Sequence, residues 1–158
     1  MALRVSCRLP PGCFLQKEVE TLSRAAQNPK RPFWAIVGGA KLSDKLGVLK
    51  DLMGKVDGFL IRGGVAFTLL KARGLSIGRS LLDEKALPEV RKLMEEATRR
   101  GTEILWPPDV RLAAALQPNS PSKFVRIEEI SSDWMGLDIS PETIKLFSQR
   151  VQQARTLL

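Results

Sequence analysis

The chain has 158 residues, of which 44% are apolar, so it is long enough for one domain with a real core. It contains neither histidine nor tyrosine, which excludes histidine-dependent catalysis and most zinc sites. The net charge of +8 favours an anionic partner. The two cysteines, Cys7 and Cys13, are too few for a disulfide framework, which favours a cytoplasmic setting.

The first half of the chain predicts helices alternating with strands. Apolar residues at helical spacing predict a helix over residues 15–26, and short apolar runs predict strands over 33–37 and 58–61. Further helices are expected over 43–53, ended by Gly54, and over 65–72.

The second half continues the alternation. Residues 87–97 predict a helix with Pro88 near its start and Gly101 after its end. Ser140, Pro141 and Glu142 are typical of a helix start, with Ser140 as the cap. Strands are expected over 103–105, 124–127 (at a sheet edge), 137–139 and 156–158, a helical turn over 109–116 and a loop over 117–123. This alternation predicts an α/β fold, a three-layer αβα sandwich around a mostly parallel, Rossmann-like sheet.

A glycine turn between a predicted strand and a predicted helix is the clearest functional signal. It reads Gly38-Gly39-Ala40-Lys41-Leu42-Ser43-Asp44-Lys45, and a helix start after glycines can hold a phosphate. Lys41 and Lys45 lie four apart, so in a helix they would share one face. The alternative is a plain turn followed by two solvated lysines. Gly63-Gly64 also follows a strand, so both turns are expected to face the same crevice, although this second pair is also compatible with a plain turn.

These turns belong to a longer series of motifs. The series continues with Val65-Ala66-Phe67-Thr68, Ile104-Leu105-Trp106-Pro107-Pro108-Asp109, Trp134-Met135-Gly136-Leu137-Asp138 and Ser140-Pro141-Glu142-Thr143. In this order the motifs resemble the first half of the nucleotide-binding domain of phosphoglycerate kinases. The resemblance places a partial domain of that type over residues 13–158, after an irregular segment over residues 1–12.

The resemblance implies phosphoryl transfer between 1,3-bisphosphoglycerate and Mg-ADP, which gives 3-phosphoglycerate and ATP in glycolysis. It implies that ADP or ATP binds with Mg held mainly by the nucleotide, without a metal site of the protein's own. The family is usually monomeric and cytoplasmic. The implied adenine pocket is lined by Gly39, Ala40, Gly63, Gly64, Gly136 and Leu137; Lys41 binds phosphates, Lys45 contacts the transferred phosphoryl group, and Asp44 positions the nucleotide. Gly136 is equally compatible with a strand-entry glycine, and Trp134 and Met135 with core positions.

The chain also departs from the family pattern. Arg62 stands where the family has the first of three glycines. The family's N-terminal domain, which holds the phosphoglycerate, and its later Gly-Gly-Gly-Asp phosphate loop have no counterpart here, so the domain is incomplete and no turnover is expected of the chain alone. 3-Phosphoglycerate is then a partner only if the N-terminal domain is supplied.

Two other functions stay open. One is a non-catalytic nucleotide-binding or interaction module. The other is a basic nucleic-acid-binding protein, which ranks third because the basic residues are scattered, so no nucleic-acid partner is expected. No apolar run is long enough to span a membrane, and residues 1–12 lack the apolar core of a secretory leader, so no membrane partner is expected either.

Overall fold

The computed structural model describes residue 20 and residues 28–158. The irregular segment 1–12, both cysteines and nearly all of the helix expected over 15–26 lie outside these residues. Among the described helices, none is both long enough and apolar enough to cross a membrane.

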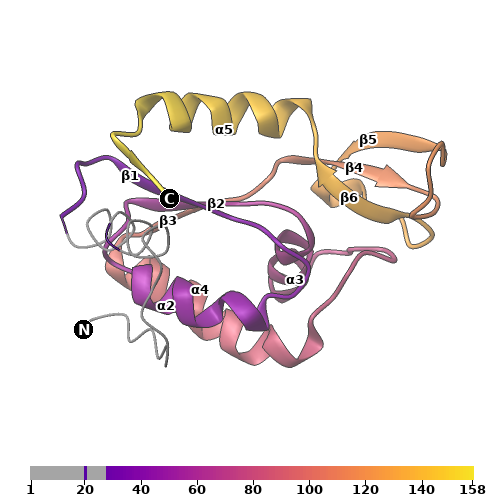
Figure 1. Cartoon of the computed structure of the whole chain (residues 1–158). Coiled ribbons are helices and arrows are strands. Elements are labelled where there is room, and N and C mark those ends of the chain that lie inside the picture. The colour runs from indigo at the N-terminus through magenta and orange to yellow at the C-terminus, as the bar shows by residue number, and fades with distance from the viewer. Residues whose placement is uncertain (1–19, 21–27) are drawn as a thin grey trace, which may run out of the picture.

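A parallel sheet, here sheet A, forms the centre of the molecule (Figure 1). Its strands lie in the order β3 (Glu103–Leu105), β2 (Gly58–Ile61), β1 (Phe33–Val37) and β7 (Thr156–Leu157). β1 and β2 are neighbours in register from Trp34 opposite Gly58 to Val37 opposite Ile61. The strands predicted at these four places are therefore confirmed, and the carboxyl ends of β1 and β2 meet at one edge of the sheet.

Helices cover both faces of sheet A, as Figure 1 shows. The helices α2 (Leu46–Leu52) and α4 (Leu87–Arg100) lie on one face, each after a short 3-10 turn, η1 (Ser43–Lys45) and η2 (Glu84–Ala86). The helix α5 (Pro141–Gln153) covers the other face, and α3 (Gly64–Ala72) follows β2. The predicted αβα layering is confirmed.

Two apolar clusters hold these layers together, one on each face. On the side of α2 and α4, Phe33, Val37 and Phe59 pack with Leu49 and Val90. On the side of α5, the cluster consists of Trp34, Leu60 and Phe147. Successive residues of a strand point to opposite faces, so the continuous apolar runs of β1 and β2 supply both clusters at once.

A second, antiparallel sheet, here sheet B, was not predicted. Its order is β5 (Ser122–Arg126), β4 (Asp109–Ala113) and β6 (Met135–Ile139), with the 3-10 turn η3 (Ile127–Glu129) after β5. The helical turn expected over 109–116 is wrong, because β4 occupies most of it. Within β4, Val110 and Leu112 are buried in a third cluster that includes Phe67, whereas Arg111 between them is exposed. The edge position expected for β5 is confirmed.

The start of α5 is where predicted, but its side-chain cap is a different residue. Ser140 occupies the cap position with extended backbone, yet its buried Oγ has no partner within the described structure. Asp109 takes the capping role. Its carboxylate accepts hydrogen bonds from the backbone N–H groups of Glu142 (3.0 Å) and Thr143 (2.8 Å). The prediction that Ser140 caps the helix is therefore wrong at the level of the side chain.

Candidate functional site

The two glycine turns lie in direct backbone contact at the carboxyl ends of β1 and β2. The Val65 N–H, in the first turn of α3, donates to the Gly39 carbonyl oxygen at 3.0 Å. A Cβ built on Gly64 would lie 2.9 Å from the Ala40 carbonyl oxygen, so this position has room only for glycine. The predicted side-by-side arrangement is confirmed, and the close approach also gives Gly64 a structural reason to be glycine.

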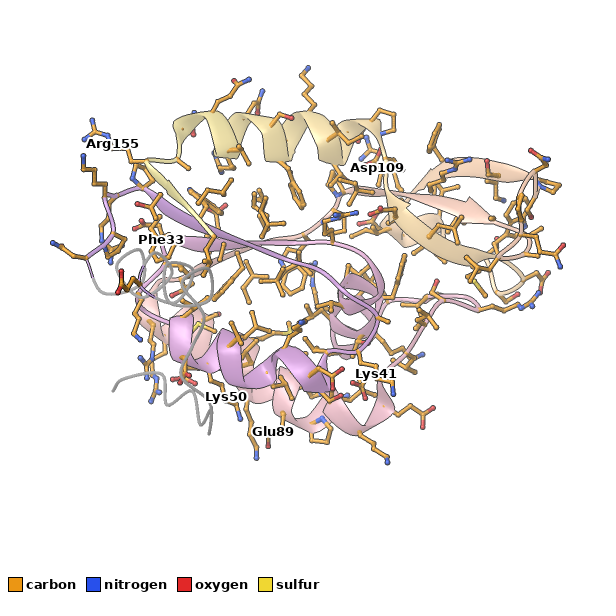
Figure 2. All side chains as sticks on the ribbon, in the orientation of Figure 1. Phe33, Lys41, Lys50, Glu89, Asp109 and Arg155 are labelled. Atoms are coloured by element: carbon orange, nitrogen blue, oxygen red, sulfur yellow. The ribbon has the colours of Figure 1, made fainter. Side chains whose placement is uncertain are left out.

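The lysines do not share a helix face, which corrects the expectation drawn from their spacing. Lys41 precedes η1, and Lys45 is the last residue of that 3-10 turn, because the helix proper begins only at Leu46. Figure 2 shows Lys41 at the same end of the molecule as the carboxyl ends of β1 and β2. The Lys45 side chain bends back toward the turn, and its Cε would lie 3.8 Å from a Cβ on Gly39.

Both lysines are exposed, and neither has an ion pair or side-chain hydrogen bond among the described residues. Lys45 also borders a groove of about 220 Å³ beside β1. The groove's other lining residues are apolar or glycine and include Ile36, Gly38, Val48 and Leu158. Within the described part of the chain, the loop therefore presents two lysines that form no ion pair, and one of them, Lys45, lines an apolar groove.

An internal carboxylate occupies the position where the sequence predicted a phosphate. Asp83 accepts a hydrogen bond from the Ser43 N–H at 2.8 Å, and its own N–H donates to Thr68 Oγ1 of α3 at 3.1 Å. The hydrogen bonds from Ser43 lower the pKa of Asp83 below its ordinary value. Asp83 lies 40 residues from Ser43 in the sequence, so no local pattern could have identified it. The Ser43 N–H is therefore already paired and is not free to bind an anionic ligand.

Of the two β6 residues that the sequence predicts for the site, Leu137 is half-buried. Gly136 is buried, its N–H donates to Ser80 Oγ at 2.8 Å, and a built Cβ would lie 2.1 Å from the ring of Phe67. Packing alone therefore requires glycine here. Trp134 packs against the core cluster of sheet B, in agreement with the core alternative.

Arg62 connects the glycine turns to β6. Its Nη2 donates to Asp138 Oδ2 at 2.7 Å, and both side chains are about half exposed. Asp138 directly follows Leu137, and Arg62 directly precedes Gly63. The ion pair thus joins the two parts of the chain that the sequence assigns to one pocket.

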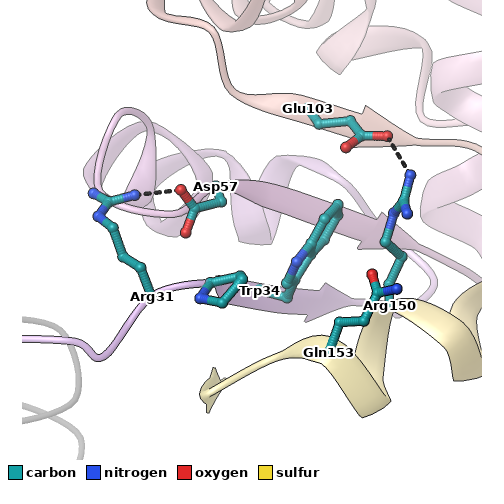
Figure 3. A pocket seen from close by; sticks show the side chains of 7 residues that line it. Arg31, Trp34, Asp57, Glu103, Arg150 and Gln153 are labelled. Atoms are coloured by element: carbon teal, nitrogen blue, oxygen red, sulfur yellow. Dashed lines mark hydrogen bonds and ion pairs between the residues drawn. The ribbon is translucent and has the colours of Figure 1, made fainter.

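The opposite, amino-terminal end of sheet A has a larger hollow of about 500 Å³ (Figure 3). Arg31 pairs with Asp57 there, and Arg150 pairs with Glu103 while its guanidinium lies 5.6 Å from the centre of the Trp34 ring. Its charges are already compensated.

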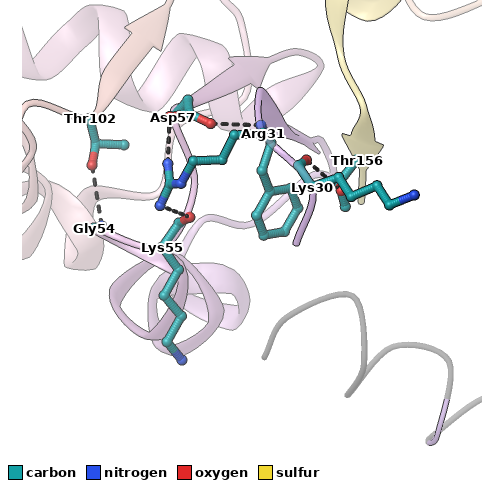
Figure 4. A network of polar contacts seen from close by, with 8 residues as sticks. Lys30, Arg31, Gly54, Lys55, Asp57, Thr102 and Thr156 are labelled. Carbon is teal, nitrogen blue, oxygen red and sulfur yellow. Dashed lines mark hydrogen bonds and ion pairs between the residues drawn. The ribbon is translucent and has the colours of Figure 1, made fainter. Parts of the chain in front are cut away.

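Backbone acceptors complete the contacts at this end of the molecule (Figure 4). Arg31 also donates to the Lys55 carbonyl oxygen at 3.1 Å, and Thr156 Oγ1 donates to that of Lys30 at 2.7 Å. These hydrogen bonds tie β7 and the start of β2 to the segment before β1. The polar contacts at the amino-terminal end of sheet A therefore stabilise the fold.

The described residues contain no group of three or more histidine, cysteine, aspartate or glutamate side chains that could hold a metal ion. Asp44 is exposed in η1, between the two lysines, and has no ion pair with another described residue. A divalent cation at this site would need most of its ligands from a bound molecule.

The sequence profile of the family described as "Phosphoglycerate kinase" matches residues 5–158 of this chain. The chain belongs to the phosphoglycerate kinase family. The resemblance inferred from the motifs is confirmed, and the match begins within the segment 1–12 that the motifs leave outside it. The family is one of kinases, which transfer phosphoryl groups.

Individual phosphoglycerate kinases agree with this assignment. One from Prochlorococcus marinus (strain MIT 9515) is 46% identical over 147 residues, and one from Dictyoglomus turgidum (strain DSM 6724 / Z-1310) is 43% identical over 147 residues. Each match covers 93% of this chain and 37% of the relative, so the chain spans little more than a third of their length.

Solved structures show the same fold. Phosphoglycerate kinase from Coxiella burnetii superposes with a TM-score of 0.87 at 36% identity, over 92% of this chain and 38% of that protein. The enzyme from Pyrococcus horikoshii OT3 is 20% identical and superposes with a TM-score of 0.76 over the same shares, which supports the fold alone.

Proposed function

We propose that this chain carries part of the nucleotide site of a phosphoglycerate kinase and binds ADP or ATP together with Mg. The observation that carries the proposal is the contact between the two glycine turns, beside which Lys41 and Lys45 have no ion pair with any described residue. In this proposal Lys41 binds the nucleotide phosphates and Lys45 contacts the transferred phosphoryl group. In the same proposal the base lies against Gly39, Ala40, Gly63, Gly64 and Leu137 and against the backbone at Gly136.

The composition of the site suits phosphoryl transfer. This reaction depends mainly on positioning and on neutralising the charge of the phosphoryl oxygens, so it does not require a histidine base. Ammonium groups supply that charge, and phosphate oxygens are ligands that Mg²⁺ accepts readily. Because no carboxylate cluster is present in the described part of the chain, Mg would be held mainly by the nucleotide, with Asp44 helping to position it.

For the 158-residue polypeptide by itself we propose nucleotide binding without turnover. The chain spans 37% of the length of its relatives, and the motifs place these residues in the nucleotide-binding domain, whereas phosphoglycerate would be held by the family's other domain. A non-catalytic nucleotide-binding module predicts the same behaviour, whereas a nucleic-acid-binding protein would show salt-dependent binding to oligonucleotides instead.

Titration calorimetry with Mg-ADP tests the proposal. We expect Lys41→Ala to weaken binding about tenfold or more, because it removes a charge-assisted hydrogen bond to a phosphate. Lys145→Ala is the matched control, since Lys145 is an exposed lysine of α5, on the other face of the sheet. Equal heats for the native chain and Lys41→Ala would exclude the role of Lys41. A coupled assay that detected ATP formation from 1,3-bisphosphoglycerate would contradict the absence of turnover.

A further inference from the structure

Arg62 directly follows the last residue of β2 and directly precedes the second glycine turn. Strand alternation places its side chain on the same face of sheet A as Leu60, which packs with Phe147 of α5. The aliphatic part of Arg62 crosses the turn after β1, because a Cβ built on Gly38 would lie 3.1 Å from Arg62 Cγ. The guanidinium then reaches β6 and pairs with Asp138 at 2.7 Å.

The pair spans the two walls of the proposed base site. Arg62 is bonded to Gly63 in the wall made by the glycine turns, and Asp138 is bonded to Leu137 in the wall made by β6. Both side chains keep 40–50% of their surface exposed, at 47% and 43%, so the pair lies at the rim rather than in the core. The pair therefore bridges the two walls at their rim.

We propose that Arg62 is a specificity-determining residue that restricts how far a nucleobase can enter between the glycine turns and β6. The inference rests on the proposed function, because it presumes that the base lies there. Binding of the base between the walls requires the Arg62–Asp138 ion pair to break. The lost energy of this half-exposed pair lowers nucleotide affinity about two- to fivefold. A polyphosphate without a base is held by the lysines alone and is indifferent to Arg62.

The test compares two probes, Mg-ADP and Mg-pyrophosphate, on the native chain and on Arg62→Gly, by calorimetry at one ionic strength. Arg62→Gly is expected to bind Mg-ADP two- to fivefold more tightly and Mg-pyrophosphate with unchanged affinity. Asp138→Asn keeps the arginine but weakens the pair, so we expect a smaller gain for Mg-ADP. Arg126→Ala is the matched control, because Arg126 also forms an exposed ion pair on sheet B, with Glu142 at 3.7 Å, and should change neither affinity.

The two probes separate the inference from the function on which it rests. If Mg-pyrophosphate binds and Arg62→Gly binds Mg-ADP no more tightly than the native chain, the inference is wrong and the phosphate site stands. A gain that is equal for both probes also overturns it, because Arg62 would then act on the phosphates. If neither probe binds either variant, the proposed function fails and the inference fails with it. No gain in Asp138→Asn would overturn the role of the ion pair.

Discussion

Replacing Asp109 by alanine should destabilise the fold more than the same replacement of Ser140, the residue that the sequence marks as the cap of α5. Asp109 is 6% exposed and its carboxylate accepts three hydrogen bonds: two from the backbone N–H groups of Glu142 and Thr143 and one, at 2.6 Å, from the Thr143 hydroxyl. Loss of a helix cap costs about 1–2 kcal/mol. The Thr143 hydroxyl keeps the Asp109 carbonyl oxygen as a second acceptor at 2.9 Å, so its share is only about 1 kcal/mol.

The free energy of unfolding of Asp109→Ala should therefore fall by about 2–3 kcal/mol, which lowers the Tm of a chain of this size by about 4 to 12 °C. Urea unfolding followed by tryptophan fluorescence measures the change. Ser140→Ala is the matched control: it removes a buried Oγ that has no partner among the described residues and keeps the carbonyl that accepts the Ile144 N–H. It should therefore stay within about 0.5 kcal/mol of the native chain. A Ser140→Ala variant as unstable as Asp109→Ala would refute the reasoning and restore Ser140 as the cap.

Two further changes test the surroundings of the site. Asp83→Asn should lower the free energy of unfolding by about 0.5–1 kcal/mol at neutral pH. Because folding lowers the pKa of Asp83, its contribution to the free energy of unfolding is complete above its unfolded-state pKa and is lost as pH falls through its folded-state pKa. Urea unfolding at several pH values should show the difference in stability between the native chain and Asp83→Asn closing below about pH 4. A difference that did not change with pH would contradict this. Gly136→Ala should cost about 1–3 kcal/mol, because the added Cβ meets the Phe67 ring, and Phe67→Leu in the same chain should recover part of that loss; no recovery would show that the ring is not the obstacle.

Much of sheet A could be predicted because its signals are local. The runs before Gly38 and Gly63 are short, almost wholly apolar and followed by glycine, which is how buried parallel strands between helices look in sequence. Their adjacency followed from the alternation with helices, which makes neighbouring strands parallel and brings their carboxyl ends to one edge.

Sheet B and the details of the site depend on contacts between distant residues. The alternation within β4 is too short to separate a strand from a helical turn until β5 and β6 pair with it on either side. The four-residue spacing of Lys41 and Lys45 would place both side chains on one helix face only if the α-helix began at Lys41. It begins at Leu46, after a 3-10 turn, so the spacing does not bring the two side chains together on one face. Asp109 lies 33 residues from Glu142 in the first turn that it caps, so the local pattern points to Ser140 instead.

The hydrogen bond from the Val65 N–H to the Gly39 carbonyl has a mechanical consequence. A ligand that rearranged the loop of Lys41 would pull on the first turn of α3, and α3 carries Phe67, whose ring lies against Gly136. Movement on one side of the proposed base site would therefore be transmitted to the other side through the single helix α3.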